Sequence, residues 1–188
     1  MGQYFTSVNL DTREYLSPLD YNQGSKLMEH SYIKNSFMGL ICQLLMPGNQ
    51  WHMNRIVWAG DYGEEGLFIN EDEPSYKGEL GNGKFNRMDY TLYHIASSIF
   101  NQIKVNNIDG ITPQFIINHT KNQYVDLNNC QTIIHPLSIL TSNGNGQGGG
   151  DYFEEEGVEY IGTWAGDIIS TNFILPKGFT EIKPNFSK

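Results

Sequence analysis

The segment VNLDTREY at residues 8–15 recurs at residues 117–124 as INHTKNQY. Each copy places an Asn six residues before a Tyr and has a polar, turn-forming centre between two strand-like ends. Turn residues between runs of β-branched and aromatic residues are typical of a β-hairpin. The two segments therefore predict two similar hairpins, one in each half of the chain.

The similarity between the halves continues downstream of the hairpins. Trp51 is followed three residues later by Asn54, and Trp164 is followed three residues later by Asp167, each before a strand-like run. Internal similarity of this kind indicates a duplicated supersecondary unit whose copies pack together. We expect a single globular domain, residues 1–188, with a pseudo-repeat at 3–62 and 112–175, joined by a surface linker and helix at 63–111.

Apolar residues at helical spacing predict two main helices, at residues 25–46 and 88–105. In this prediction the second half has no counterpart of the first helix. It has the short apolar run IIHPLSIL and a glycine-rich loop in its place. Further strands are expected at residues 55–62, 167–175 and 180–183. The predicted fold class is α+β, with a mostly antiparallel sheet, or two small ones, and two helices on one side.

The composition narrows the classes of partner. The net charge is −9, and the only arginines are Arg13, Arg55 and Arg87, so the electrostatic field disfavours nucleic acid. The same field favours a basic protein partner or a cation. Two cysteines in no paired motif, no secretory segment and no long apolar run predict a cytoplasmic protein with reduced thiols and no membrane association.

The glycine-rich stretch SNGNGQGGGD, residues 142–151, is the most unusual local feature. It lacks the lysine of a phosphate-binding P-loop, and no helix follows it as a dinucleotide-binding motif requires. Its backbone N–H groups could still converge on a small phosphate-bearing, nucleotide-like ligand, unless the loop only makes a turn. The ligand-binding residues predicted on this basis are Asn143, Asn145, Gly148, Gly149, Gly150 and Asp151, with Trp164 as a stacking wall and Asp167 at the border.

A calcium site is an alternative use of the same loop. Counted from Asn143, oxygen-bearing side chains fall at positions 1, 3, 5, 9 and 12, with Gly148 at position 6, as in a calcium-binding loop. Only Asp151 and Glu154 in this set are anionic. The sequence therefore predicts at most weak Ca²⁺ binding, and no other cofactor.

Evidence for catalysis is sparse. The five histidines show no zinc-ligand spacing, and no G-x-S-x-G or S-x-x-K nucleophile motif is present. His135, near Asp151 in sequence, is the best candidate for a general base. Whether the protein is an enzyme stays open, with a non-enzymatic role favoured.

Several of these motifs occur together in a known group of proteins. The start MGQY, the two hairpins, and HPLSILTSNGNGQGGGD followed by GTWAGDI resemble a family of bacterial and phage proteins with no established activity. The resemblance implies a soluble, intracellular, phage- or mobile-element-associated protein, and it implies no reaction.

Together these features predict a small acidic binding protein that acts by occupying a protein partner, as inhibitors and immunity proteins do. The alternatives are a protein that binds, sequesters or processes a small nucleotide-like ligand, and a weak calcium-binding protein.

Overall fold

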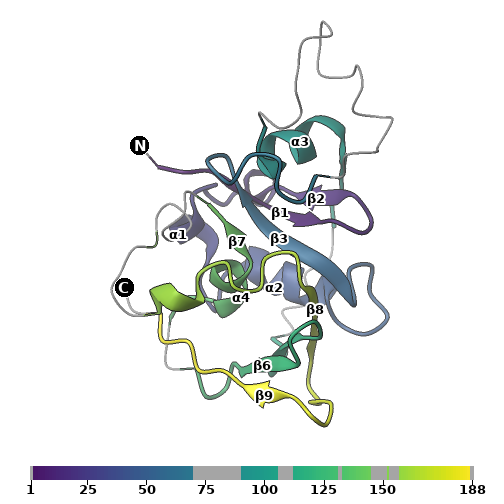
Figure 1. Ribbon diagram of the computed structural model, residues 1–188, viewed down its shortest axis with the longest axis vertical. Helices are drawn as coiled ribbons and strands as arrows, with labels where there is room; N and C mark the ends of the chain where they lie inside the picture. The colour runs from purple at the N-terminus through teal and green to yellow at the C-terminus, as the bar shows by residue number, and fades with distance from the viewer. Residues whose placement is uncertain are drawn as a thin grey trace, which may run out of the picture.

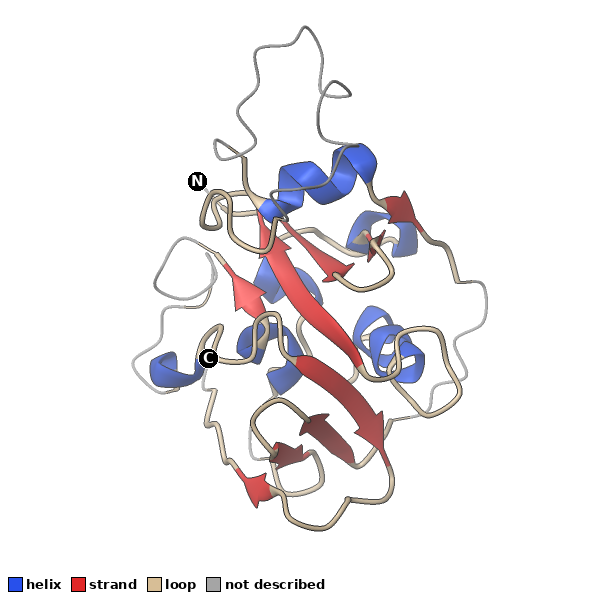
Figure 2. Cartoon of the chain, turned by 45° about the vertical axis from the view of Figure 1, so that its right-hand side comes forward, coloured by secondary structure: helices blue, strands red, loops and turns tan. Residues whose placement is uncertain are grey.

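The computed structural model describes residues 2–69, 90–105, 112–130, 133–144, 152 and 157–186. Within these ranges the chain forms one nine-stranded, mostly antiparallel sheet and four α-helices (Figure 1). The predicted α+β class is confirmed. In Figure 2, β3 and β8 follow one another through the middle of the molecule, with helices around them.

The first half of the chain builds one side of the sheet in the order β4-β2-β1-β3. β1 and β2 form the first predicted hairpin, β3 pairs with β1 antiparallel, and β4 pairs with β2 parallel. The bounds of these strands are Phe5–Asn9 for β1, Glu14–Leu16 for β2, Asn54–Gly60 for β3 and Asn101–Gln102 for β4.

The second half builds the other side in the matching order β9-β6-β5-β8. β5 and β6 form the second hairpin, β8 pairs with β5 antiparallel, and β9 pairs with β6 parallel. The bounds are Phe115–Asn118 for β5, Gln123–Asp126 for β6, Ile168–Asn172 for β8 and Thr180–Glu181 for β9. A short strand, β7 at Ser142–Asn143, pairs with β3.

The two halves meet where β3 and β8 pair antiparallel, with Asn54 opposite Ile169. The hairpins lie toward opposite ends of the sheet (Figure 1). Because β4 and β9 take part, the structural correspondence extends beyond the bounds predicted for the pseudo-repeat. A common origin of the halves stays a prediction.

Equivalent side chains in the two halves make equivalent hydrogen bonds. The Trp51 indole N–H donates to Glu14 at 2.9 Å, and the Trp164 indole N–H donates to Gln123 at 3.0 Å. Glu14 and Gln123 are the first residues of β2 and β6. The Trp residues that marked the repeat in the sequence therefore close the core beside each hairpin.

The helix predicted at 25–46 is broken into α1 (Leu27–His30) and α2 (Ser36–Leu44). The break occurs because the side-chain oxygen Oδ1 of Asn35 accepts from the backbone N–H groups of Phe37 and Met38, which starts a new helix. The prediction that the second half lacks this helix is wrong, because α4 (Pro136–Leu140) takes the same place. The N–H of Trp164 donates to Leu140, as that of Trp51 donates to Leu44.

The prediction that both main helices lie on one side of the sheet is also wrong. Residues of α2 and α4 pack with Ile56 and Trp58 of β3, whereas α3 (Leu92–Ile99) packs with Val57 and Ala59. Side chains alternate along a strand, so these two pairs face opposite sides of the sheet. α3 is shorter than the predicted 88–105 helix, because the chain leaves it to form β4.

The second half has no such helix between β8 and β9, where residues 173–179 are all described. Ser170 and Asn172 take the register positions that Val57 and Ala59 occupy in the first half. The Ser170 hydroxyl bonds with the His119 ring at 2.7 Å. Polar residues therefore replace apolar ones where no helix covers the sheet.

We expect Gly162→Ala to lower the free energy of unfolding by about 2 kcal/mol. Gly162 has a φ of +67°, and an added Cβ would lie 2.6 Å from the backbone oxygen of Ser142 in β7. Gly178 has a φ of +89° with nothing within 4 Å of the added Cβ, so Gly178→Ala should cost only about 1 kcal/mol. Urea denaturation measures both. Equal losses would show that the contact with β7 adds no constraint.

Candidate functional site

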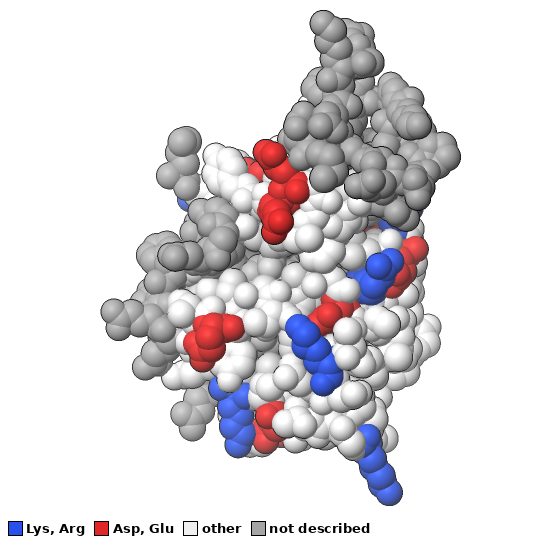
Figure 3. Space-filling view, in the orientation of Figure 1, with Lys and Arg blue, Asp and Glu red and all other residues white. Residues whose placement is uncertain are grey.

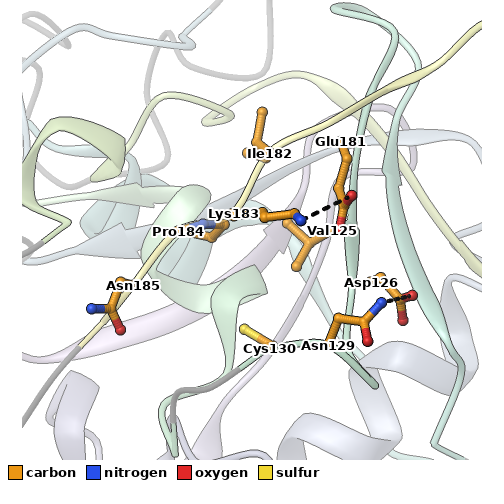
Figure 4. A pocket seen from close by; sticks show the side chains of 9 residues that line it. All are labelled: Val125, Asp126, Asn129, Cys130, Glu181, Ile182, Lys183, Pro184 and Asn185. Carbon is orange, nitrogen blue, oxygen red and sulfur yellow. Dashed lines mark hydrogen bonds and ion pairs between the residues drawn. The ribbon is translucent and has the colours of Figure 1, made fainter.

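A pocket of about 370 Å³ lies at the outer edge of the second half of the sheet (Figure 4). β6 and the turn after it form one wall, and β9 with the segment that follows it forms the other. The lining residues are Val125, Asp126, Asn129, Cys130, Glu181, Ile182, Lys183, Pro184 and Asn185. This volume is within the usual range for pockets that hold a small group.

The lining of the pocket combines apolar and polar side chains. Val125 and Pro184 are buried, and the Cys130 thiol points into the space between the two walls in Figure 4. Lys183 and Glu181 form an ion pair at 3.6 Å along one wall, and the Asn129 amide donates to Asp126 at 2.8 Å on the other. Apolar side chains beside paired polar groups suit an uncharged ligand group with a polar end.

A tyrosine occupies the equivalent place in the first half. Tyr15 and Tyr124 have the same register in their hairpins, and six residues further along the chain are Tyr21 and Cys130. The intervening turns also match, since Asp20 N–H donates to the Ser17 carbonyl as Asn129 N–H does to that of Asp126. Cys130 is therefore the structural counterpart of Tyr21.

The contacts of Tyr21 show what this place accommodates. The Tyr21 hydroxyl accepts from the backbone N–H of Val105 at 2.9 Å, and its ring lies 5.6 Å from that of Phe37. Val105 follows β4 as Pro184 follows β9, and Pro184 lines the pocket. The pocket therefore corresponds to the space that a tyrosine side chain takes up in the first half.

Two of the residues predicted to bind a ligand make contacts within the protein. Trp164 is fully buried and presents no ring face to a ligand. Asp167 accepts from the Asn118 amide at 2.8 Å and pairs with Lys121 at 3.2 Å. Its counterpart Asn54 accepts from an Asn amide in the same way, so this acid stabilises the hairpin turn.

His135, the predicted general base, is buried and caps α4. Its Nδ1 accepts from the Leu137 N–H at 3.3 Å, which places the proton of the neutral ring on Nε2, 3.4 Å from the Cys42 sulfur. Burial lowers the pKa of His135 to about 4 and raises the pKa of Cys42 to about 12. At neutral pH both groups are uncharged and enclosed, an arrangement unlike that of an activated thiolate and its base.

Asn143 lies in β7, and its backbone and side chain fit against two glycines. An added Cβ on Gly63 would lie 2.4 Å from the Asn143 side-chain oxygen, and one on Gly60 would lie 3.0 Å from its backbone oxygen. The start of the glycine-rich loop is thus held against the end of β3. The remaining predicted loop residues lie outside the described part of the chain: Asn145, Gly148, Gly149, Gly150, Asp151 and Glu154.

Within the described ranges, no three His, Cys, Asp or Glu side chains are grouped so that they could hold a metal ion. The predicted calcium ligands Asp151 and Glu154 are not in these ranges, so the calcium prediction stays a prediction. None of the described helices is both long enough and apolar enough to cross a membrane.

The pocket residues were missed at the level of sequence, although a signal was present. Extending the alignment of the hairpins by six residues sets Cys130 opposite Tyr21, a small side chain opposite a large one. In comparisons with family models, curated proteins and solved structures, no match to this chain was found. The pocket and its filled counterpart are therefore the observations on which a function can be argued.

Proposed function

We propose that this chain is a binding protein that occupies a protein partner, with the pocket at Cys130 as its point of attachment. The observation that carries the proposal is the difference between the two halves: Tyr21 fills one position, and Cys130 leaves its counterpart open. Filling an apolar cavity stabilises a fold. A cavity kept open at one of two equivalent positions favours a role in binding for the open one.

The position and chemistry of the pocket support a protein partner. Energetically dominant contacts between proteins are often side chains of one partner inserted into pockets of the other. The net charge of −9 would add long-range attraction for a basic partner. On the face shown in Figure 3, the described acidic and basic side chains are interspersed, so the attraction would come from the overall charge.

Capture of partners by three immobilised forms of the chain tests the proposal. Cys130→Tyr places in the pocket the residue that fills its counterpart, and Cys130→Ala leaves the pocket open as the matched control. We expect proteins retained by the original chain and by Cys130→Ala to be reduced at least tenfold on Cys130→Tyr. Circular dichroism should show the same fold for all three. Retention of the same proteins by all three forms, or of none, would overturn the proposal.

A further inference from the structure

We infer that the pocket at Cys130 accepts an uncharged phenol group, and that the partner supplies it as a tyrosine side chain. This inference rests on the proposed function, since it names the group that would enter the same pocket. It follows from the relation between the two halves: the equivalent space already holds a phenol, that of Tyr21, between a hairpin and the segment after the outer parallel strand.

The aliphatic residues of the pocket correspond to aliphatic residues near Tyr21 in the first half. Leu16 and Ile103 in the first half correspond to Val125 and Ile182 in the second, so both places have an aliphatic side chain on the hairpin strand and another just after the outer parallel strand. The main change is Tyr21 to Cys130, which removes a ring and leaves a thiol. A planar ring entering from outside would therefore meet aliphatic side chains at the positions of Leu16 and Ile103 near Tyr21.

The polar end of the entering group would meet a changed environment. The Tyr21 hydroxyl accepts from Val105 N–H, whereas Pro184 at the corresponding position has no N–H to donate. A phenol in the pocket would have to use its hydroxyl as a donor to a carbonyl or carboxylate, or accept from a side chain at the rim.

Charges at the rim select against an anionic ligand. Asp126 and Glu181 line the pocket together with a single lysine, Lys183, which is already paired with Glu181. A phosphate group would approach two carboxylates, and its repulsion from them would offset its attraction to the lysine. The neutral phenol of tyrosine meets no such repulsion.

Titration with p-cresol, the side chain of tyrosine as a free molecule, tests the inference by NMR. We expect the original chain to bind one p-cresol with a dissociation constant of roughly 1 mM, with shifts at residues that line the pocket. Cys130→Tyr should bind at least tenfold more weakly. Tyr21→Ala, which opens the equivalent place, should bind two molecules. Phenyl phosphate should bind the original chain at least tenfold more weakly than p-cresol.

The outcomes separate this inference from the proposed function. If p-cresol does not shift the pocket residues of the original chain, or binds Cys130→Tyr equally well, the phenol assignment is overturned. If Cys130→Tyr still reduces the capture of partners, that result would support the pocket as an attachment point for some other group. Stronger binding of phenyl phosphate than of p-cresol would overturn the assignment in favour of an anionic ligand. If Tyr21→Ala does not fold, the comparison of p-cresol binding between the original chain and Cys130→Tyr still tests the phenol assignment.

Discussion

Lowering the pH from 7 to 5 is expected to reduce the free energy of unfolding by about 4 kcal/mol through two buried histidines. Burial lowers the pKa of His30 to about 4, against the weaker opposing effect of a hydrogen bond to the Gly24 carbonyl. Burial likewise lowers the pKa of His135 to about 4. The ordinary value for both is 6.5.

Hydrogen bonds explain why neither ring can accept a proton in the folded state without losing a hydrogen bond. His30 Nδ1 donates to Gly24, so its Nε2 is the acceptor for the Trp58 indole N–H at 2.9 Å. His135 Nδ1 is the acceptor for Leu137 N–H. Protonation would turn each acceptor into a donor facing another donor.

The direction of the pH effect follows from the two pKa values. The unfolded chain takes up protons on these histidines as the pH falls through 6.5, whereas the folded chain does so only near pH 4. The stabilisation is therefore complete above pH 6.5 and is lost as the pH falls toward 4. At pH 5 each histidine accounts for a loss of about 2 kcal/mol.

Urea denaturation at pH 7, 6 and 5 measures the loss. His135→Asn should remove about half of it, because an Asn keeps the helix cap, as Asn35 does for α2, without a titrating ring. His94→Gln, at an exposed position on α3, is the matched control and should show the loss of the original chain. A free energy of unfolding that is constant between pH 7 and 5 would contradict the prediction.

Tyr21→Ala is expected to lower the free energy of unfolding by about 3 kcal/mol. The substitution removes a partly buried ring that packs against Phe37, and the hydroxyl that accepts from Val105 N–H. The backbone N–H of Val105 would lose that partner, which adds to the cost. Thermal or urea denaturation measures the change.

Cys130→Ala is the matched substitution in the second half and should cost less than about 1 kcal/mol. Cys130 is small and borders a space that is already open, so its removal creates little additional cavity. The difference between the two variants thus measures the asymmetry between the halves. Similar losses would mean that the second position is as well filled as the first.

Local patterns in the sequence predicted the hairpins well, because the residues that specify each hairpin turn lie within a stretch of eight. The residues of VNLDTREY and INHTKNQY form the end of one strand, the turn and the start of the next. Both turns include a left-handed residue, Arg13 at φ 55° and Asn122 at φ 52°, so even the backbone conformation recurs. Such local preferences act before any tertiary contact is made.

The helices were predicted less accurately, because a long-range backbone bridge and a local helix cap set their bounds. The 25–46 segment has a continuous apolar pattern, but Tyr32 bridges to Ile134 and Asn35 starts a new helix. The counterpart α4 has only five residues, too few for periodicity to reveal it. Helix periodicity alone could not show where packing would interrupt or shorten these helices.

By itself, the sequence determined the fold class, the two hairpins and the buried Trp residues beside them, since these depend on local spacing and apolar content. Only the tertiary structure decided that Trp164 and His135 belong to the core and that a pocket opens at Cys130. That pocket exists because β9 pairs with β6 and brings Pro184 opposite a turn more than fifty residues earlier. The small side chain of Cys130 therefore borders a pocket only because of this long-range contact.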